Sequence, residues 1–147
     1  MIVVRDLWGS DLESDGFVEC LEALSPVGTI PLEEAREIYR WRLGHGCYTF
    51  VAVDGDEIVG TATLTLERKF IHGGSWAGRV EEVAVRRDRQ HQGIGTLLMR
   101  HVNQKAQELG CYKVVLGCSE ANVPFYQRTG YRVYDVGMRQ DFPREET

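Results

Sequence analysis

The segment Gln90-His-Gln-Gly-Ile-Gly95 constrains the fold more than any other part of the chain. It lies between residues 79–86, whose alternating valines predict a strand, and residues 96–109, whose apolar side chains recur at helical spacing. A glycine-rich turn that enters a helix presents unpaired backbone N–H groups, which together with the helix dipole attract an anion. The segment therefore predicts an α/β fold with a phosphate-binding turn. An ordinary strand-to-helix turn remains the alternative.

The rest of the sequence alternates strand and helix patterns, and its 147 residues fit one domain, residues 1–147. The pair Asp54-Gly55 separates two β-rich runs and predicts a hairpin turn between them. In the strand at 79–86, strict alternation places Glu81 and Glu82 on opposite faces. The further predicted elements are strands at 2–4, 48–53, 58–66 and 112–118, helices within 10–24 and 29–44, a short helix capped by Asn122, and a last strand pair within 131–142.

Charge and cysteine usage narrow the classes of function. Lys and Arg total 17 against 22 Asp and Glu, so the chain lacks the cationic excess that is typical of nucleic-acid binding. No apolar run approaches the ~20 residues that would span a membrane. The cysteines form no C-x-x-C pair and the histidines lack metal-ligand spacing, so we expect no bound metal. Four cysteines without a recognised targeting signal predict a cytoplasmic or other reducing intracellular location.

Two segments about 30 residues apart together resemble a known signature. Gln90-x-x-Gly93-x-Gly95, followed downstream by Asn122-Val-Pro-Phe-Tyr126-Gln-Arg-Thr-Gly-Tyr131, resembles the acetyl-CoA motif of the GNAT superfamily of N-acetyltransferases. Within that superfamily, Glu67-Arg-Lys-Phe-Ile-His72, Val80-Glu-Glu-Val83 and Gly110-Cys-Tyr-Lys113 resemble the glucosamine 6-phosphate N-acetyltransferases. The resemblance spans roughly residues 6–142 and implies a central mixed, mostly antiparallel sheet, flanked by helices and splayed at the cofactor.

The resemblance also implies a reaction. Acetyl would pass directly from acetyl-CoA to the 2-amino group of D-glucosamine 6-phosphate, a step in UDP-N-acetylglucosamine biosynthesis. Tyr126 would be the general acid or the stabiliser of the departing thiolate. Glu81, the Leu116 carbonyl or a water held by Glu82 would assist the amine. The implied cofactor contacts are Val83, Ala84, Val85, Gln90, His91, Gln92, Gly93, Ile94, Gly95, Thr96, Asn122 and Tyr126.

A second set of matched residues is implied to bind the sugar phosphate. In the resembling family part of this set comes from the second subunit of a homodimer, so a homodimer with shared active sites is expected here. Lys69 and Lys113 are the candidates for meeting the phosphate charge. The implied substrate contacts are Ser25, Lys69, Phe70, Ile71, His72, Glu81, Glu82, Val83, Tyr112 and Lys113.

Two departures from the family pattern keep other functions open. Gly117 stands where the family often carries an aspartate credited with orienting the amine, and Asp141 stands where a late phosphate-binding arginine is found. Arg139 or Arg144 would have to replace that arginine. The alternatives are a GNAT enzyme acting on a peptide N-terminus, a polyamine or an aminoglycoside, and a non-catalytic acetyl-CoA-binding module.

Overall fold

The computed structural model of the chain describes residues 1–144. Its described residues fall into two compact units, residues 1–116 and residues 117–144. The elements of the first unit are β1 (Ile2–Asp6), a 3-10 turn (Gly9–Glu13), α1 (Gly16–Glu22), α2 (Leu32–Leu43), β2 (Cys47–Asp54), β3 (Glu57–Arg68), α3 (Ile71–Gly74), β4 (Trp76–Val85), a second 3-10 turn (Arg87–Arg89), α4 (Ile94–Glu108) and β5 (Cys111–Val115). The second unit holds a 3-10 turn (Glu120–Asn122) and α5 (Val123–Arg128).

The five strands form one sheet in the order β1-β2-β3-β4-β5. Neighbouring strands from β1 to β4 are antiparallel, whereas β5 runs parallel to β4, which confirms a mixed and mostly antiparallel sheet. The ladder between β4 and β5 ends at the pair Arg79 and Val115, although β4 continues to Val85. The second half of β4 therefore has no partner strand on its β5 side within residues 1–116.

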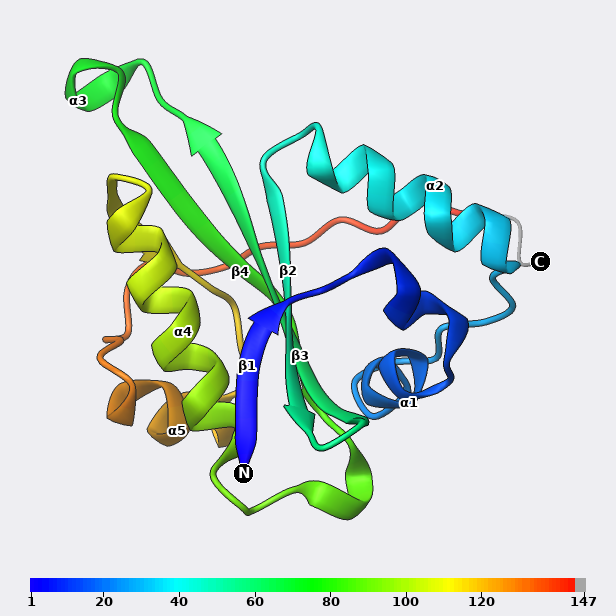
Figure 1. Cartoon of the computed structure of the whole chain (residues 1–147). Helices are drawn as coiled ribbons and strands as arrows, with labels where there is room; N and C mark the ends of the chain where they lie inside the picture. Colours follow the sequence, from blue (N-terminus) through cyan, green and yellow to red (C-terminus); the bar gives the residue numbers. More distant parts are fainter. Residues whose placement is uncertain (145–147) are drawn as a thin grey trace. The chain divides into compact units, whose positions relative to one another are not determined.

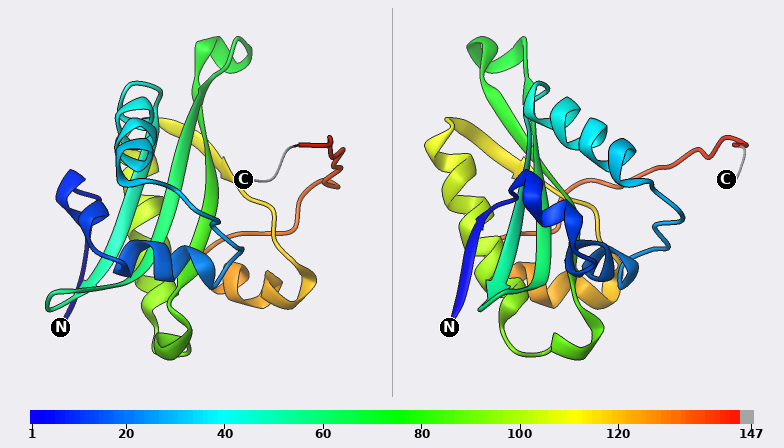
Figure 2. Two further views of the ribbon diagram at one scale, coloured as in Figure 1. Left: turned by 90° about the vertical axis from the view of Figure 1, so that its right-hand side faces the viewer. Right: turned by 45° about the vertical axis from the view of Figure 1, so that its right-hand side comes forward.

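Helices cover both faces of this sheet, with α4 on one side and α1 and α2 on the other (Figures 1 and 2). Under α4, Phe50 of β2 is fully buried and meets the His101 ring edge-on at 4.9 Å. Gly60 lets α4 approach closely, because a Cβ there would lie 2.9 Å from the Leu98 side chain. On the opposite face, Cys20 of α1 is completely buried, and its thiol donates to the Ile58 carbonyl.

Three predicted elements differ from the structure. The helix expected within residues 10–24 is a 3-10 turn followed by α1, because the chain bends between Glu13 and Gly16. A single turn, α3, interrupts the loop before β4, and it caps the β3–β4 hairpin that projects from the sheet (Figure 1). The last strand pair within 131–142 is wrong: residues 131–144 form no strand, since a strand needs a partner and none pairs with this segment among the described residues.

Candidate active site

The turn between β4 and α4 has the backbone geometry of an anion site. His91 and Gly93 take φ values of 64° and 83°, and α4 begins at Ile94. The N–H groups of the first helical turn have no partners inside the helix, so they face outward. A Cβ placed on Gly93 would meet no atom within 4 Å, so the approach to these amides is open. The predicted turn therefore has free donors, a helix dipole and access, all of which suit a phosphate.

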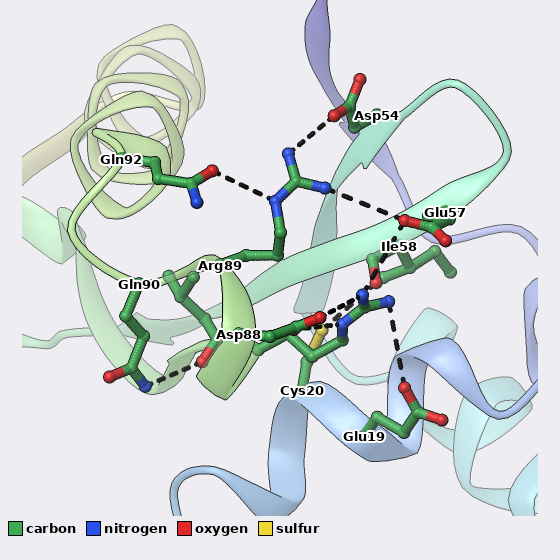
Figure 3. A network of polar contacts seen from close by, with 11 residues as sticks. Glu19, Cys20, Asp54, Glu57, Ile58, Asp88, Arg89, Gln90 and Gln92 are labelled. Carbon is green, nitrogen blue, oxygen red and sulfur yellow. Dashed lines mark hydrogen bonds and ion pairs between the residues drawn. The ribbon is translucent and has the colours of Figure 1, made fainter.

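An arginine network fixes this turn, and it was not foreseen from the sequence (Figure 3). Arg89 binds Asp54 of the β2–β3 hairpin at 2.6 Å and donates to the Gln92 side chain at 3.1 Å. Arg86 binds Asp88 at 2.8 Å and reaches Glu57 at 3.8 Å. We call this set the loop network; its members are Glu19, Asp54, Glu57, Arg86, Asp88, Arg89 and Gln92.

The charges of the loop network shift the titration of its members. The Arg89 guanidinium, through its hydrogen bond, is the main cause that lowers the pKa of Asp54, and Arg86 lowers the pKa of Asp88 in the same way. Asp88 in turn raises the pKa of Arg86. Both carboxylates are therefore held ionised, and the Asp54–Arg89 pair ties the turn electrostatically to the hairpin.

The open edge of β4 presents the backbone groups predicted for cofactor contact. Arg86 donates its N–H to the Val59 carbonyl at 2.9 Å, so the backbone groups of position 86 point toward β3. Because these groups alternate along a strand, those of Val85 and Val83 point to the opposite edge, which no strand within residues 1–116 pairs. The Gln90 side chain donates to the Val85 carbonyl at 3.1 Å, which joins the turn to this edge (Figure 3).

A β-bulge corrects the expected alternation of Glu81 and Glu82. The ladder with β3 shifts by one residue between Thr61 and Thr63, and Glu82 takes a left-handed φ of 50°. The hydroxyl of Thr63, whose backbone partner is Glu81, donates to the Glu82 carboxylate at 3.3 Å. Both carboxylates therefore lie on one face of the sheet, because the bulge adds a residue to β4.

The Glu82 carboxylate also meets a cation that sequence reasoning missed. Arg42 of α2 binds Glu82 at 2.5 Å and donates to the hydroxyls of Thr49 at 2.9 Å and Thr63 at 3.2 Å. We call Arg42, Thr49, Thr63 and Glu82 the bulge network. No local signal marks it, because Arg42 and Glu82 are 40 positions apart and belong to different elements.

The predicted substrate residues gather only in part. His72 of α3 contacts Tyr112 of β5 with ring centroids 4.6 Å apart, so these two segments do meet. Lys69 pairs with Glu67 at 2.7 Å, and Lys113 lies 5.5 Å above the Tyr112 ring. Phe70 and Ile71 are exposed at the tip of the hairpin.

Three further predicted positions, Ser25, Glu81 and Leu116, lie outside the contact between His72 and Tyr112. Ser25 follows α1, and Figures 1 and 2 show α1 and α3 at opposite ends of the sheet. Glu81 pairs with Arg79 at 2.6 Å and is exposed, and Leu116 follows directly after β5. One chain therefore does not bring Ser25 to the hairpin tip.

The second unit carries Tyr126 on α5, and its backbone is firmly held. The Tyr126 carbonyl accepts hydrogen bonds from the N–H groups of Thr129 and Tyr131, at 3.0 and 3.1 Å, and from the Thr129 hydroxyl at 2.8 Å. Burial, and then the nearby Cys118, raises the pKa of Tyr126, so its hydroxyl stays protonated at neutral pH. Asn122 precedes α5 but makes no side-chain cap, contrary to the prediction. Arg139 pairs with Asp141 at 2.7 Å.

Within residues 1–144, no cluster of three His, Cys, Asp or Glu side chains could hold a metal ion. None of the helices in that range is both long and apolar enough to cross a bilayer.

Comparisons with known proteins agree with this geometry. The Arabidopsis thaliana glucosamine-6-phosphate N-acetyltransferase superposes with a TM-score of 0.90 at 28% identity, covering 97% of this chain and 99% of that one. The Trypanosoma brucei brucei protein named glucosamine 6-phosphate N-acetyltransferase is 33% identical over 94% of each chain. The chain spans 59% of the Drosophila melanogaster protein called a probable enzyme of that name, at 36% identity over 87% of this chain. The sequence model of the Acetyltransferase (GNAT) family matches residues 15–131, and the chain therefore belongs to that family.

Proposed function

We propose that this chain is a glucosamine 6-phosphate N-acetyltransferase that uses acetyl-CoA, with both units acting as one domain. The observation that carries the proposal is the open edge of β4 ending at the free amides of α4. An extended pantetheine arm can pair with the backbone of Val83 and Val85 while the pyrophosphate lies on the first-turn amides. The names of the relatives supply the substrate class.

The residues of the chain would serve the transfer in distinct ways. Bound acetyl-CoA supplies an acetyl group activated as a thioester, which the sugar amine attacks directly. The Val83 N–H would donate to the thioester oxygen as negative charge develops on it. The Tyr126 hydroxyl, which is protonated at neutral pH, would donate to the departing sulfur. Glu81 and the Leu116 carbonyl remain the proposed acceptors for the amine proton.

The sugar-phosphate contacts favour a homodimer with shared sites. Lys69 and Lys113 would meet the phosphate, beside His72 and Tyr112, which touch one another at the hairpin tip. Ser25 lies toward the other end of the sheet in the same chain, so a second copy would be needed to complete the set. All four cysteines are free, which fits the proposed reducing compartment, cytoplasmic or otherwise intracellular.

The test is coenzyme A release from acetyl-CoA with a panel of amines. The panel contains glucosamine 6-phosphate, glucosamine, glucosamine 1-phosphate, spermidine, an aminoglycoside and a short peptide. We expect selective turnover of glucosamine 6-phosphate. Selective turnover of another amine would refute the sugar-phosphate assignment, and acetyl-CoA binding without turnover of any amine would support the non-catalytic module.

Two sets of variants test the proposed roles. Tyr126→Phe should lower kcat by about 10²-fold, within the range for general acid catalysis, while acetyl-CoA affinity stays unchanged. Tyr134→Phe is the control, because Tyr134 belongs to the same unit but is exposed.

Lys69→Ala and Lys113→Ala should mainly raise the KM for the sugar phosphate. An unchanged KM in both would refute the proposed phosphate contacts.

A further inference from the structure

The bulge in β4 decides where the Val83 N–H points. Thr63 pairs with Glu81 and Thr61 pairs with Ala84, so the single residue between them on β3 faces two residues of β4. Without that extra residue, Val83 would itself pair with Thr61 and would point its N–H into the β3 ladder. The bulge therefore turns this donor toward the open edge.

The backbone of Glu82 does not adopt this conformation on its own. A φ of 50° lies in the left-handed region, which side chains with a Cβ rarely occupy unless their surroundings hold them there. The contacts that hold Glu82 are those of the bulge network. Arg42 and Thr63 both bind the same carboxylate oxygen, at 2.5 and 3.3 Å.

The hydrogen bonds of the Arg42 guanidinium are made within the bulge network. Its two terminal nitrogens are engaged by Glu82, Thr49 and Thr63, and its side chain is 23% exposed. Glu82 is the carboxylate with which it pairs among residues 1–144. Arg42 is thus anchored to β2 and β3 and reaches across the sheet to the bulge of β4.

We propose that Arg42 is a positioning residue, which holds the Glu82 bulge so that the Val83 N–H faces the reacting thioester. This inference rests on the proposed acetyl transfer, and it names a residue of α2 that acts through Glu82 without touching either substrate. Its loss should impair the step in which charge develops on the carbonyl oxygen, and not the binding of acetyl-CoA to the amides of α4.

Steady-state kinetics of Arg42→Gln test whether Arg42 acts on the chemical step and not on the binding of acetyl-CoA. We expect kcat to fall by roughly 10- to 100-fold, part of the ~10²–10³-fold cost of losing a whole oxyanion donor, with the Kd for acetyl-CoA changed by less than about threefold. Arg40→Gln is the matched control, because Arg40 lies on the same helix and its side chain pairs with the exposed Glu33 alone among residues 1–144. Arg42→Lys should recover part of kcat, since it restores a cation near Glu82.

A double variant tests whether Arg42 acts through Glu82. Once Glu82→Gln has removed the carboxylate, adding Arg42→Gln should lower kcat by less than about twofold further. Independent, multiplying effects would overturn the proposal, as would a kcat of Arg42→Gln equal to that of the wild type. If Arg42→Gln does not fold, Thr63→Val decides: it removes one donor to Glu82 at nearly constant volume and should lower kcat several-fold, and an unchanged kcat overturns the proposal.

Hydrogen exchange separates this inference from the proposed function. Exchange of the amides in residues 80–86 needs no turnover, and it should be faster in Arg42→Gln than in Arg40→Gln. Equal exchange in the two variants overturns the positioning role. If the wild-type protein acetylates no amine, the proposed function fails, and the exchange result then still reports whether Arg42 holds the bulge.

Discussion

The loop network and the bulge network differ in how many carboxylates hold each arginine. Arg86 lies within 4 Å of carboxylates from three residues and Arg89 from two, whereas Arg42 pairs with Glu82 alone among the described residues. The loop network also holds the turn between β4 and α4, in which backbone amides are the proposed pyrophosphate contacts. The loop network can lose one carboxylate and keep others on its arginines, whereas the bulge network has the Glu82 carboxylate alone among the described residues. We therefore expect small effects on stability and kinetics from single substitutions in the loop network, and larger effects from substitutions in the bulge network.

The largest effect on stability should come from Glu82→Ala. It leaves the half-buried Arg42 without its carboxylate, and we expect the free energy of unfolding to fall by about 1–2 kcal/mol. Denaturant unfolding measures this change. Glu81→Ala is the control, because its exposed pair with Arg79 should contribute no more than about 0.5 kcal/mol. Equal losses in the two variants would mean that the Arg42–Glu82 pair contributes no more than an exposed ion pair.

A smaller effect is expected for Arg89→Gln, and on a different kinetic constant. Without its bonds to Asp54 and Gln92 the turn is less well organised for the pyrophosphate, so the KM for acetyl-CoA should rise about 3- to 10-fold with kcat nearly constant. Arg87→Gln removes the same charge from the same turn, where the Arg87 side chain bonds the Glu22 carbonyl alone within the described part of the chain. An equal rise in both variants would assign the effect to charge alone.

Acid titration should weaken the loop network gradually. The pKa of Asp54 is lowered in the folded state, so its contribution to stability is fully present above its ordinary value of 3.8 and is lost as the pH falls through the folded value. The difference in unfolding free energy between wild type and Asp54→Asn should therefore shrink below about pH 4. Denaturant unfolding between pH 7 and pH 2.5, in steps, would show it. A constant difference over that range would argue against the Arg89 pair.

The smallest effect should follow Glu57→Gln. Glu57 lies 3.8 Å from both Arg86 and Arg89, each of which has a closer carboxylate at 2.8 and 2.6 Å. We expect the unfolding free energy to change by less than about 0.5 kcal/mol and the KM for acetyl-CoA to stay constant. A loss above about 1 kcal/mol would mean that the loop network is not redundant.

Local signals predicted the elements that form from neighbouring residues. The β2–β3 hairpin was predicted because Gly55 supplies the positive φ that its turn requires, and the turn before α4 because its glycines precede a strong helical pattern. The bulge was missed, because glutamate rarely takes a left-handed conformation and nothing near Glu82 in the sequence signals one. The Arg42–Glu82 pair was missed because only the folded sheet brings α2 and β4 together. The strand expected within 131–142 failed because a β pattern does not reveal whether a partner strand exists.

The left-handed conformation of Glu82 also bears on how this chain would respond to selection for heat resistance. Such a backbone conformation costs on the order of 1–3 kcal/mol in a residue other than glycine, and glycine adopts it freely. Glu82→Gly would release that strain but would also remove the carboxylate that Arg42 binds. Because losing the carboxylate costs about 1–2 kcal/mol, which is close to the strain released, the substitution would leave stability nearly unchanged while it slowed the enzyme. Selection for heat resistance would therefore gain little at position 82.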